Sequence, residues 1–294
     1  MISRVTSQTM TRTTQQNLQT GLSELARLRE RAVTGNAIGR PSEDPSGTKA
    51  ALSVRAELRA NEQHSRNINN GDAWLTTVDA AMSTTTDLLN RVKDLALRGA
   101  NDSTLSPAGR EGLAAELESL GAELLKQANT THQGRAVFAG NSDTGKAFDG
   151  SFAYAGVSGS GVERRMTANS TVRVDADGAA VFGQGPDSVF ALVNTMVTDL
   201  RAGTGTSSHL AAIDSRTEAV LGQHAAVGAR HAELLRAREA NVSKSVELET
   251  QRSGIEDLDL SEVVMDMKLQ EIAYQNALAV SARVLQPTLM DFLR

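Results

Sequence analysis

The residues that come nearest to a known chemical motif form the glycine-rich segment 140–147, with the sequence GNSDTGKA. It follows the phosphate-binding loop pattern as far as Lys146, but the next residue, where that pattern needs a Ser or Thr hydroxyl for Mg²⁺, is Ala147. Such a loop must also lead into a helix whose N-terminal amides face the phosphate. Turn-like residues, Phe148-Asp149-Gly150, follow instead. We interpret the segment as an ordinary loop and keep nucleotide binding as a distant alternative.

Other candidate sites also fail on context. His224 and His231 lie seven residues apart on a predicted helix, without the H-E-x-x-H arrangement of a zinc site. The glycines at 156, 159 and 161 have the wrong order for a dinucleotide fingerprint. The chain has no cysteine, which excludes disulfides, thiolate zinc sites and cysteine nucleophiles. We therefore expect a protein that is not an enzyme, with no catalytic residue, cofactor or metal.

The composition of the chain argues against several kinds of binding partner. The 294 residues carry a formal net charge of -5 and no cluster of Lys and Arg, which argues against nucleic acid and against a basic membrane-surface helix. No apolar run approaches the roughly 20 residues of a membrane span. The polar segment 1–20 lacks the apolar core of a cleaved signal peptide. Aromatic residues are only 3% of the chain, which favours thin helical bundles over a thick layered core.

Steps of three and four residues predict helices through most of the chain. The first arm carries a narrow apolar stripe, a break follows at Gly39-Arg40-Pro41, and Asp44-Pro45 restarts the helix as N-cap and first helical residue. We expect a polar helix over 46–67, another over 72–98 and a further helix capped by Ser106-Pro107. The second has a continuous a/d seam. This seam consists of Trp74, Val78, Ala81, Thr85, Leu88, Val92 and Leu95.

The middle of the chain changes character. Residues 140–185 are rich in Gly, Ser and Asp with short apolar alternations, so we predict a small β insertion with a hairpin turn at Asp177-Gly178. Helical spacing returns over 189–200, over 210–252 and from Leu260 to the C-terminus. The predicted fold is mainly α: an elongated antiparallel helical bundle, or coiled coil, made by the N- and C-terminal halves, with a small β-rich insertion.

We expect five segments from this pattern. They are an N-terminal assembly arm (1–40), the N-terminal half of the bundle (41–139), the β insertion (140–185), the C-terminal half of the bundle (186–257) and a C-terminal assembly arm (258–294). Each arm's stripe is too narrow to bury itself, and an isolated helix is marginal in water, so the arms need a partner surface. The predicted assembly interface consists of Leu18, Leu22, Leu25, Val264, Met267, Tyr274, Leu278, Leu285, Leu289 and Phe292.

Several segments resemble the flagellin superfamily. Residues 34–45, TGNAIGRPSEDP, look like its S-G-x-R-I-x-x-P-S-D-D-P turn, with the matching turn residues Arg40, Pro41, Ser42, Asp44 and Pro45. Residues 67–75 are similar to its N-x-x-x-x-x-x-W/Y-L segment, and residues 227–230 match its V-G-A-R block. The chain is thereby identified as a member of this superfamily.

Two branches of the superfamily are candidates for this chain. Residues 138–140 (FAG), 171–183 and 187–192 resemble the proteins of the hook–filament junction, and the end of the chain, 287–293, is similar to their S-L-x-D-Y-L tail. Flagellins, the filament subunits, tend to end in a plainer L-x-L-L, so we favour the junction branch and keep flagellin as the alternative.

This resemblance implies a structural subunit of the extracellular bacterial flagellum that acts without catalysis. The subunit would be exported through the flagellar type III apparatus without a cleaved signal peptide, with the help of an export chaperone. It would form a homo-oligomeric ring layer between the first hook-associated protein and flagellin.

Overall fold

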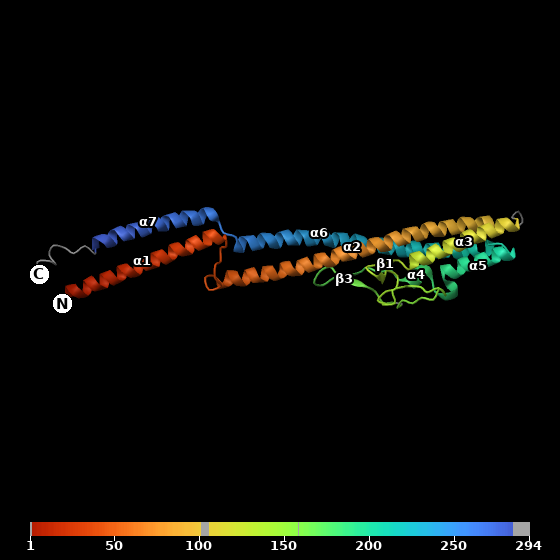
Figure 1. Cartoon of the computed structure of the whole chain (residues 1–294), viewed down its shortest axis with the longest axis horizontal. Helices are drawn as coiled ribbons and strands as arrows, with labels where there is room; N and C mark the ends of the chain where they lie inside the picture. Colours follow the sequence, from red (N-terminus) through yellow and green to blue (C-terminus); the bar gives the residue numbers. More distant parts are fainter. Residues whose placement is uncertain (1, 101–105, 158, 285–294) are drawn as a thin grey trace. The chain divides into compact units, whose positions relative to one another are not determined.

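The computed structural model of the chain describes residues 2–100, 106–157 and 159–284, and most of them are helical (Figure 1). The helices and strands follow in this order: α1 (Ile2–Thr34), α2 (Pro45–Gly99), α3 (Pro107–Ala128), β1 (Thr131–His132), β2 (Arg135–Ala136), β3 (Glu163–Arg165), β4 (Thr171–Arg173), α4 (Gly178–Phe182), η2 (Gly185–Asp187), α5 (Val189–Ala202), η3 (Ser207–His209), α6 (Leu210–Glu256) and α7 (Leu260–Val284). The expected class, mainly helical with N-terminal helices paired to C-terminal ones, is confirmed.

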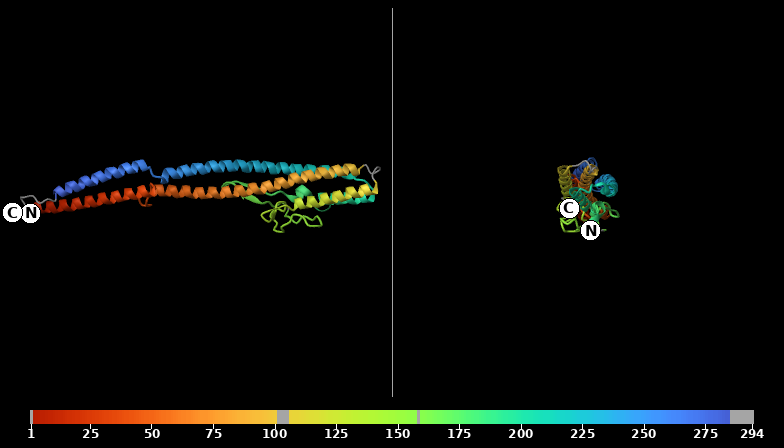
Figure 2. Two further views of the ribbon diagram at one scale, coloured as in Figure 1. Left: turned by 45° about the horizontal axis from the view of Figure 1, so that its top comes forward. Right: turned by 90° about the vertical axis from the view of Figure 1, so that its right-hand side faces the viewer.

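The chain divides into two compact units. Residues 1–59 and 245–294 form the first, here called the arm unit, and residues 60–244 form the second, the central unit. Within the arm unit α1 pairs with α7, and within the central unit α2 pairs with α6 (Figure 2). None of the helices within the described residues is long and apolar enough to cross a membrane.

Helix α2 runs without interruption from Pro45 to Gly99, so the expectation of two helices was wrong. Asn70 and Gly71, which lie between the two expected helices, are inside α2. A Cβ on Gly71 would lie 2.8 Å from Leu234 Cδ1 and 3.2 Å from Val174 Cγ1. The glycine therefore allows close packing of α2 against α6 and against Val174, the residue after β4. A sequence pattern cannot distinguish such a glycine from one in a turn.

Helices α2 and α6 form an antiparallel pair with buried apolar residues at steps of seven, as in a coiled coil. These residues are Ile68, Leu75, Met82 and Leu89 on α2, and Ile213, Val220, Val227 and Leu234 on α6. Polar pairs lie between the apolar layers: His231 Nε2 is 2.7 Å from Asp72 Oδ1, and His224 Nε2 is 2.7 Å from Asp79 Oδ1. From one pair to the next, the residue number rises by seven on α2 and falls by seven on α6, as it must in an antiparallel pair. The two pairs therefore favour the observed register of α2 against α6.

A reciprocal amide pair continues the seam. Asn241 Nδ2 donates to Asn61 Oδ1 at 2.7 Å and to the Asn61 carbonyl at 3.1 Å, while Asn61 Nδ2 donates to the Asn241 carbonyl at 3.1 Å. These two residues take the place of one apolar layer. A polar residue at a core position of a coiled coil specifies register at a cost in stability.

The seam predicted from Trp74 to Leu95 is a second face of α2. All of its residues are buried except Leu88, which is partly buried. It joins the apolar cluster that includes α3 and α5, and those two helices pack closely where Gly121 approaches Val193. Ser106 caps α3 as expected, because its hydroxyl accepts from the Gly109 amide at 3.1 Å.

The β region is smaller than expected and begins earlier. Two antiparallel two-stranded sheets are present, β1–β2 and β3–β4, and the first precedes residue 140. The predicted hairpin at Asp177-Gly178 was wrong. The Asp177 carboxylate accepts from the Ala179 amide at 3.0 Å and caps the short helix α4, which contains Val181 and Phe182. Asp is as favourable at a helix N-cap as in a turn, so sequence alone could not separate the two.

Aromatic side chains, although few, gather here. The cluster contains five of the six phenylalanines of the chain, with ring centroids 5.1–5.8 Å apart between neighbours. Its members are Phe138, Phe148, Phe152, Phe182 and Phe190. Tyr154 packs at its edge, and its hydroxyl donates to the Phe138 carbonyl at 2.9 Å. A small aromatic core therefore holds the loops of this region together.

The Asn61–Asn241 pair gives a test of register. We expect Asn241→Leu alone to lower the free energy of unfolding by about 1 kcal/mol, because Asn61 loses its amide partner. Combined Asn61→Leu and Asn241→Leu should restore the loss by completing the apolar layer. Urea unfolding of the full chain, followed by circular dichroism, measures both. An Asn241→Leu variant as stable as wild type would show that the pair contributes nothing.

Tyr154 gives a pH test. Burial, and secondarily the carboxylates of Asp177 and Asp175, raise the pKa of Tyr154 from 10.0 to about 12. A raised pKa means that the fold favours the neutral phenol. This contribution is present below pH 10 and is lost as the pH rises towards about 12. The chain has two tyrosines, so the difference in tyrosinate absorbance between wild type and Tyr154→Phe isolates this group. A difference titration with its midpoint near pH 10 would contradict the assignment.

Candidate assembly surfaces

The arm unit pairs α1 with α7 through a narrow seam. On α1 the facing residues are Leu18, Gly21, Leu25 and Leu28, which follow steps of three and four. On α7, Gln270 Nε2 donates to the Gly21 carbonyl at 3.4 Å, and Tyr274 Cδ2 lies 3.4 Å from where a Cβ on Gly21 would be. The absence of a side chain at Gly21 lets the two helices approach closely.

The predicted α1 residues fall on both sides of this seam. Leu25 is buried and Leu18 is half-buried, but the Leu22 side chain is 51% exposed. Leu28, which is buried, was missed. The seam passes through Gly21 rather than Leu22, and a glycine carries no hydrophobic signal in the sequence.

The residues predicted on α7 also include some that lie on the seam with α1 and some that are exposed. Met267 and Tyr274 are half-buried against α1, whereas Val264 and Leu278 are exposed. Val263 and Ser281 are buried and were not predicted. The remaining predicted residues, Leu285, Leu289 and Phe292, lie outside the described residues.

A second apolar face of α7 has no partner among the residues that the structure describes. Met265, Leu269, Ile272 and Val280 are each between 54% and 60% exposed. With Val264 and Leu278 they leave much of the apolar surface of α7 in water. Contiguous exposed apolar surface of this kind marks an interaction site.

The turn between α1 and α2 is held by Asp44. Its carboxylate accepts from the Ser46 hydroxyl at 2.7 Å and from the Gly47 amide at 2.8 Å. These bonds, the Gly47 amide first, lower the pKa of Asp44. With Pro45 as the first residue of α2, this is the N-cap expected from the sequence. Arg40, Pro41 and Ser42 are exposed in the turn.

Backbone bonds join this turn to the break between α6 and α7. The Ala37 amide donates to the Glu256 carbonyl at 2.7 Å, and the Leu258 amide donates to the Gly35 carbonyl at 3.1 Å. Asn36 and Asp257 form an antiparallel bridge. Asp259 caps α7, with its carboxylate 2.9 Å from the Ser261 amide. The two chain reversals of the arm unit thus stabilise each other.

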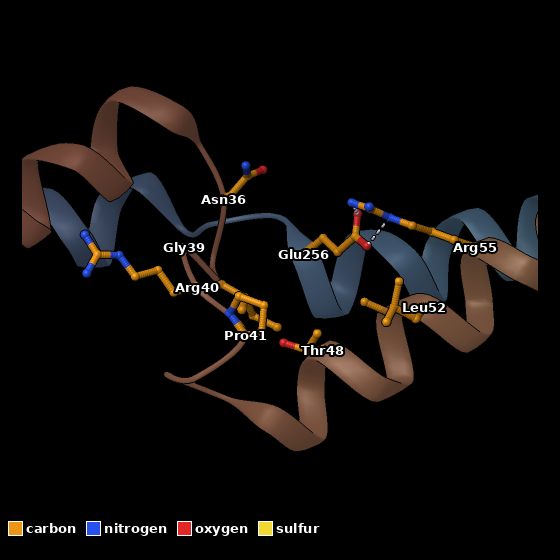
Figure 3. Close-up of a pocket in the computed structure, with 10 residues that line it drawn as sticks. Asn36, Gly39, Arg40, Pro41, Thr48, Leu52, Arg55 and Glu256 are labelled. Carbon is orange, nitrogen blue, oxygen red and sulfur yellow. Dashed lines mark hydrogen bonds and ion pairs between the residues drawn. The ribbon is translucent and has the colours of Figure 1, made fainter.

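An ion pair lies beside this junction. The Arg55 guanidinium of α2 and the nearly buried carboxylate of Glu256 are 2.6 Å apart, which raises the pKa of Arg55. Figure 3 shows these side chains reaching toward each other, while the Arg40 guanidinium points away. They line a pocket of about 150 Å³ together with Asn36, Ile38, Pro41 and Leu52. The pocket is part of the junction between the two reversals, and Glu256 gave no signal in the sequence.

Two motif residues of the central unit have defined packing roles. Arg230 Nη1 donates to the carbonyls of Asp175 at 2.8 Å and of Arg173 at 3.2 Å, so it ties α6 to the end of β4. Burial, and secondarily the nearby Arg173, lower the pKa of Arg230. Trp74 is buried beneath the Arg164 guanidinium, whose carbon is 5.5 Å from the ring centroid. Both residues are structural rather than chemical.

The rejected chemical motifs have ordinary structural roles. In the glycine-rich segment, Thr144 Oγ1 donates to the Lys146 carbonyl and Ala147 is buried. No helix follows: Ala147 and Phe148 donate their amides to the Asn129 side chain. His224 and His231 each face an aspartate on α2. Among the described residues no cluster of His, Asp and Glu has the arrangement of a metal site.

Residues 5–143 match the family described as the bacterial flagellin N-terminal helical region. The chain is also 25% identical over 259 residues to the flagellar filament 30.7 kDa core protein of Treponema maltophilum, covering 86% of both chains. The matched family region covers somewhat less than half of the chain. It is 32% identical over 142 residues to the B-type flagellin of Pseudomonas aeruginosa, of which it spans only 29%.

Solved structures of superfamily members share the fold. A putative flagellar hook-associated protein from Vibrio parahaemolyticus matches with a TM-score of 0.67 and 21% identity, over 73% of this chain and 100% of that one. Hook-associated protein 3 from Legionella pneumophila matches with a TM-score of 0.61 and 17% identity, over 69% and 98%. These matches show that the chain shares the fold of these flagellar proteins.

The Asp44 cap predicts the effect of a small substitution. A Cβ on Gly47 would lie 2.2 Å from Asp44 Oδ2 and 2.8 Å from Ile38 Cδ1. We expect Gly47→Ala to displace the cap and lower the free energy of unfolding by about 1 kcal/mol. Gly112→Ala in α3, where open space surrounds the glycine, is the matched control and should be stabilising. Thermal unfolding followed by circular dichroism compares them. Equal stabilisation of both variants would contradict this role.

Proposed function

We propose that this chain is the subunit of the junction between hook and filament, and that it assembles through α1 and α7. The observation that carries the proposal is the fold. The hook-associated proteins from V. parahaemolyticus and L. pneumophila are matched over essentially their whole length, whereas the flagellin of P. aeruginosa is matched over less than a third.

The exposed face of α7 supports assembly through the arms. Its apolar residues are half or more in water in the single chain, although α7 already pairs with α1. Burying one Leu, Ile or Met fully is worth about 1.5–3 kcal/mol. Several such residues per subunit supply a driving force for polymerisation and offset the ordering of long side chains. Residues 1–40 and 258–294 are accordingly the proposed assembly arms.

The proposed partners follow from position in the flagellum. Copies of the chain form a ring layer, with the first hook-associated protein on one side and flagellin on the other. Export uses the type III apparatus and a chaperone.

A filament subunit is the second candidate. The match to the T. maltophilum filament core protein covers 86% of both chains, so a short filament protein has much the same extent as this one. The two functions differ in what is lost with the gene. Without a junction subunit, hooks form and flagellin is shed into the medium. Without a filament subunit, no flagellin is shed.

Deletion of the gene in its own bacterium tests the proposal. We expect intact hooks, free flagellin in the culture supernatant and loss of swimming, all restored by the wild-type gene. Electron microscopy of hooks and immunoblots of the supernatant measure these outcomes. A deletion strain with no flagellin in the supernatant, but with flagellin still in the cells, would favour the filament alternative.

Complementation with variants tests the arms. Leu269→Asp with Ile272→Asp should reduce the fraction of hooks that bear filaments by about tenfold or more, since a charge replaces apolar burial. Gln275→Asp, at another exposed position of α7, is the control. If the double variant complements as well as Gln275→Asp does, the face of α7 is not an assembly surface.

A further inference from the structure

The methionines of the chain are distributed unevenly between its two units. Six of the eight lie within the described residues. The three in the central unit are buried, namely Met82, Met166 and Met196. In the arm unit, Met10 and Met265 are 57% and 60% exposed, and Met267 is half-buried. Among the described residues, the thioethers that solvent reaches freely are therefore confined to the arms.

Met265 lies on the side of α7 that faces away from α1. A line of buried and half-buried residues follows α7 at steps of four and three, and it consists of Val263, Met267, Gln270, Tyr274, Ala277 and Ser281. Successive residues of a helix are about 100° apart, so Met265 lies about 200° from Val263 and hence from this line. Leu269 and Ile272 continue from Met265 at steps of four and three. We call these three exposed residues the outer face of α7.

An exposed thioether is open to two-electron oxidation by a peroxide. The sulfur lone pair of Met265 attacks one oxygen of hydrogen peroxide, and a sulfur–oxygen bond forms as the oxygen–oxygen bond breaks. The proton on the transferred oxygen passes to the departing hydroxide, which leaves as water. The sulfur is oxidised to the sulfoxide and the peroxide is reduced. The product is a polar, chiral side chain, which two reductases, one for each epimer, convert back to methionine.

We propose that Met265 is an oxidation site that controls whether a free subunit can assemble. With the thioether, the outer face of α7 is apolar at all three positions, and with the sulfoxide it carries a strong hydrogen-bond acceptor at one of them. Burying such an acceptor without a donor opposes association. We expect the oxidised subunit to bind at least about tenfold more weakly. The inference rests on the proposed function, in which α7 is buried when subunits assemble.

The distribution of the methionines makes this control specific. Buried thioethers react only when the structure around them opens, so a brief exposure to peroxide leaves the central unit unmodified. Oxidation at Met265 therefore changes the capacity of the arms to assemble and leaves the fold of the central unit intact. Once a subunit is in place, the outer face of α7 is covered and Met265 is protected. The oxidant thus stops free subunits from joining and does not dismantle the subunits already assembled.

Mass spectrometry of the purified full chain, after a short treatment with hydrogen peroxide, measures the reactivity of each methionine. Met265 should gain oxygen at least about tenfold faster than Met82, Met166 and Met196, because only its sulfur is exposed. Met267, which is half-buried, should react at an intermediate rate. Trypsin leaves Met265 and Met267 in one peptide, 253–268, so fragment ions are needed to distinguish them. Equal rates for Met265 and Met82 would overturn the proposal.

Binding to hooks isolated from the deletion strain tests the consequence. Oxidised wild-type chain should sediment with these hooks at least about tenfold less than untreated chain, and treatment with both reductases should restore binding. Oxidised Met265→Leu should bind as the untreated chain does. Oxidised Met10→Leu, which lacks the other exposed thioether, is the matched control and should remain sensitive. Thermal unfolding of each oxidised chain separates a lost contact from a lost fold.

Complementation of the deletion strain gives a readout without an oxidant. Met265→Gln, a neutral polar substitute for the sulfoxide, should lower the fraction of hooks bearing filaments by about tenfold, while Met265→Leu should complement as wild type does. Val246→Gln replaces a residue of α6 that is 63% exposed and is the control. Met265→Gln that complements fully, or oxidised Met265→Leu that fails to bind hooks, would overturn the proposal. Untreated wild-type chain that does not bind these hooks would instead count against the junction function.

Discussion

The register between α2 and α6 is the constraint on which the rest of the central unit depends. Apolar layers at steps of seven would by themselves permit slippage by a whole heptad. The Asn61–Asn241 pair, together with the two His–Asp pairs, makes one alignment distinct. A slip would leave several half-buried polar groups without partners, and each such loss costs about 1–3 kcal/mol.

The register between α2 and α6 determines which of their residues meet the elements that pack around the two helices. Gly71 must meet Leu234 for β4 to approach, and Arg230 must reach the carbonyls of β4. The second face of α2, which runs from Trp74 to Leu95, then joins the cluster with α3 and α5. Because α6 is fixed by its α2 face and by Arg230, its third side remains outward.

The arm unit is stabilised differently from the central unit. Its pairing is a single narrow seam, and much of the apolar surface of α7 remains in water. The junction of the two chain reversals is by contrast densely bonded, with Asp44, Glu256 and Asp259 each satisfying backbone amides or side chains. A firmly held reversal next to a helix pair with a spare apolar face is suited to a subunit whose arms gain their remaining contacts from other copies.

The sequence by itself determined the helical class, the small β region and the caps at Asp44 and Ser106. These depend on local spacing and on residues whose preference is strong, and the structure confirms them. Only the tertiary structure decided which side of each helix is covered. Gly21 and Gly71 lie at contacts although they carry no hydrophobic signal, while Leu22 is exposed. Asp177 caps a helix rather than a hairpin because its neighbours pack against Phe138. Burial depends on what lies across the interface, and periodicity along one helix cannot report that.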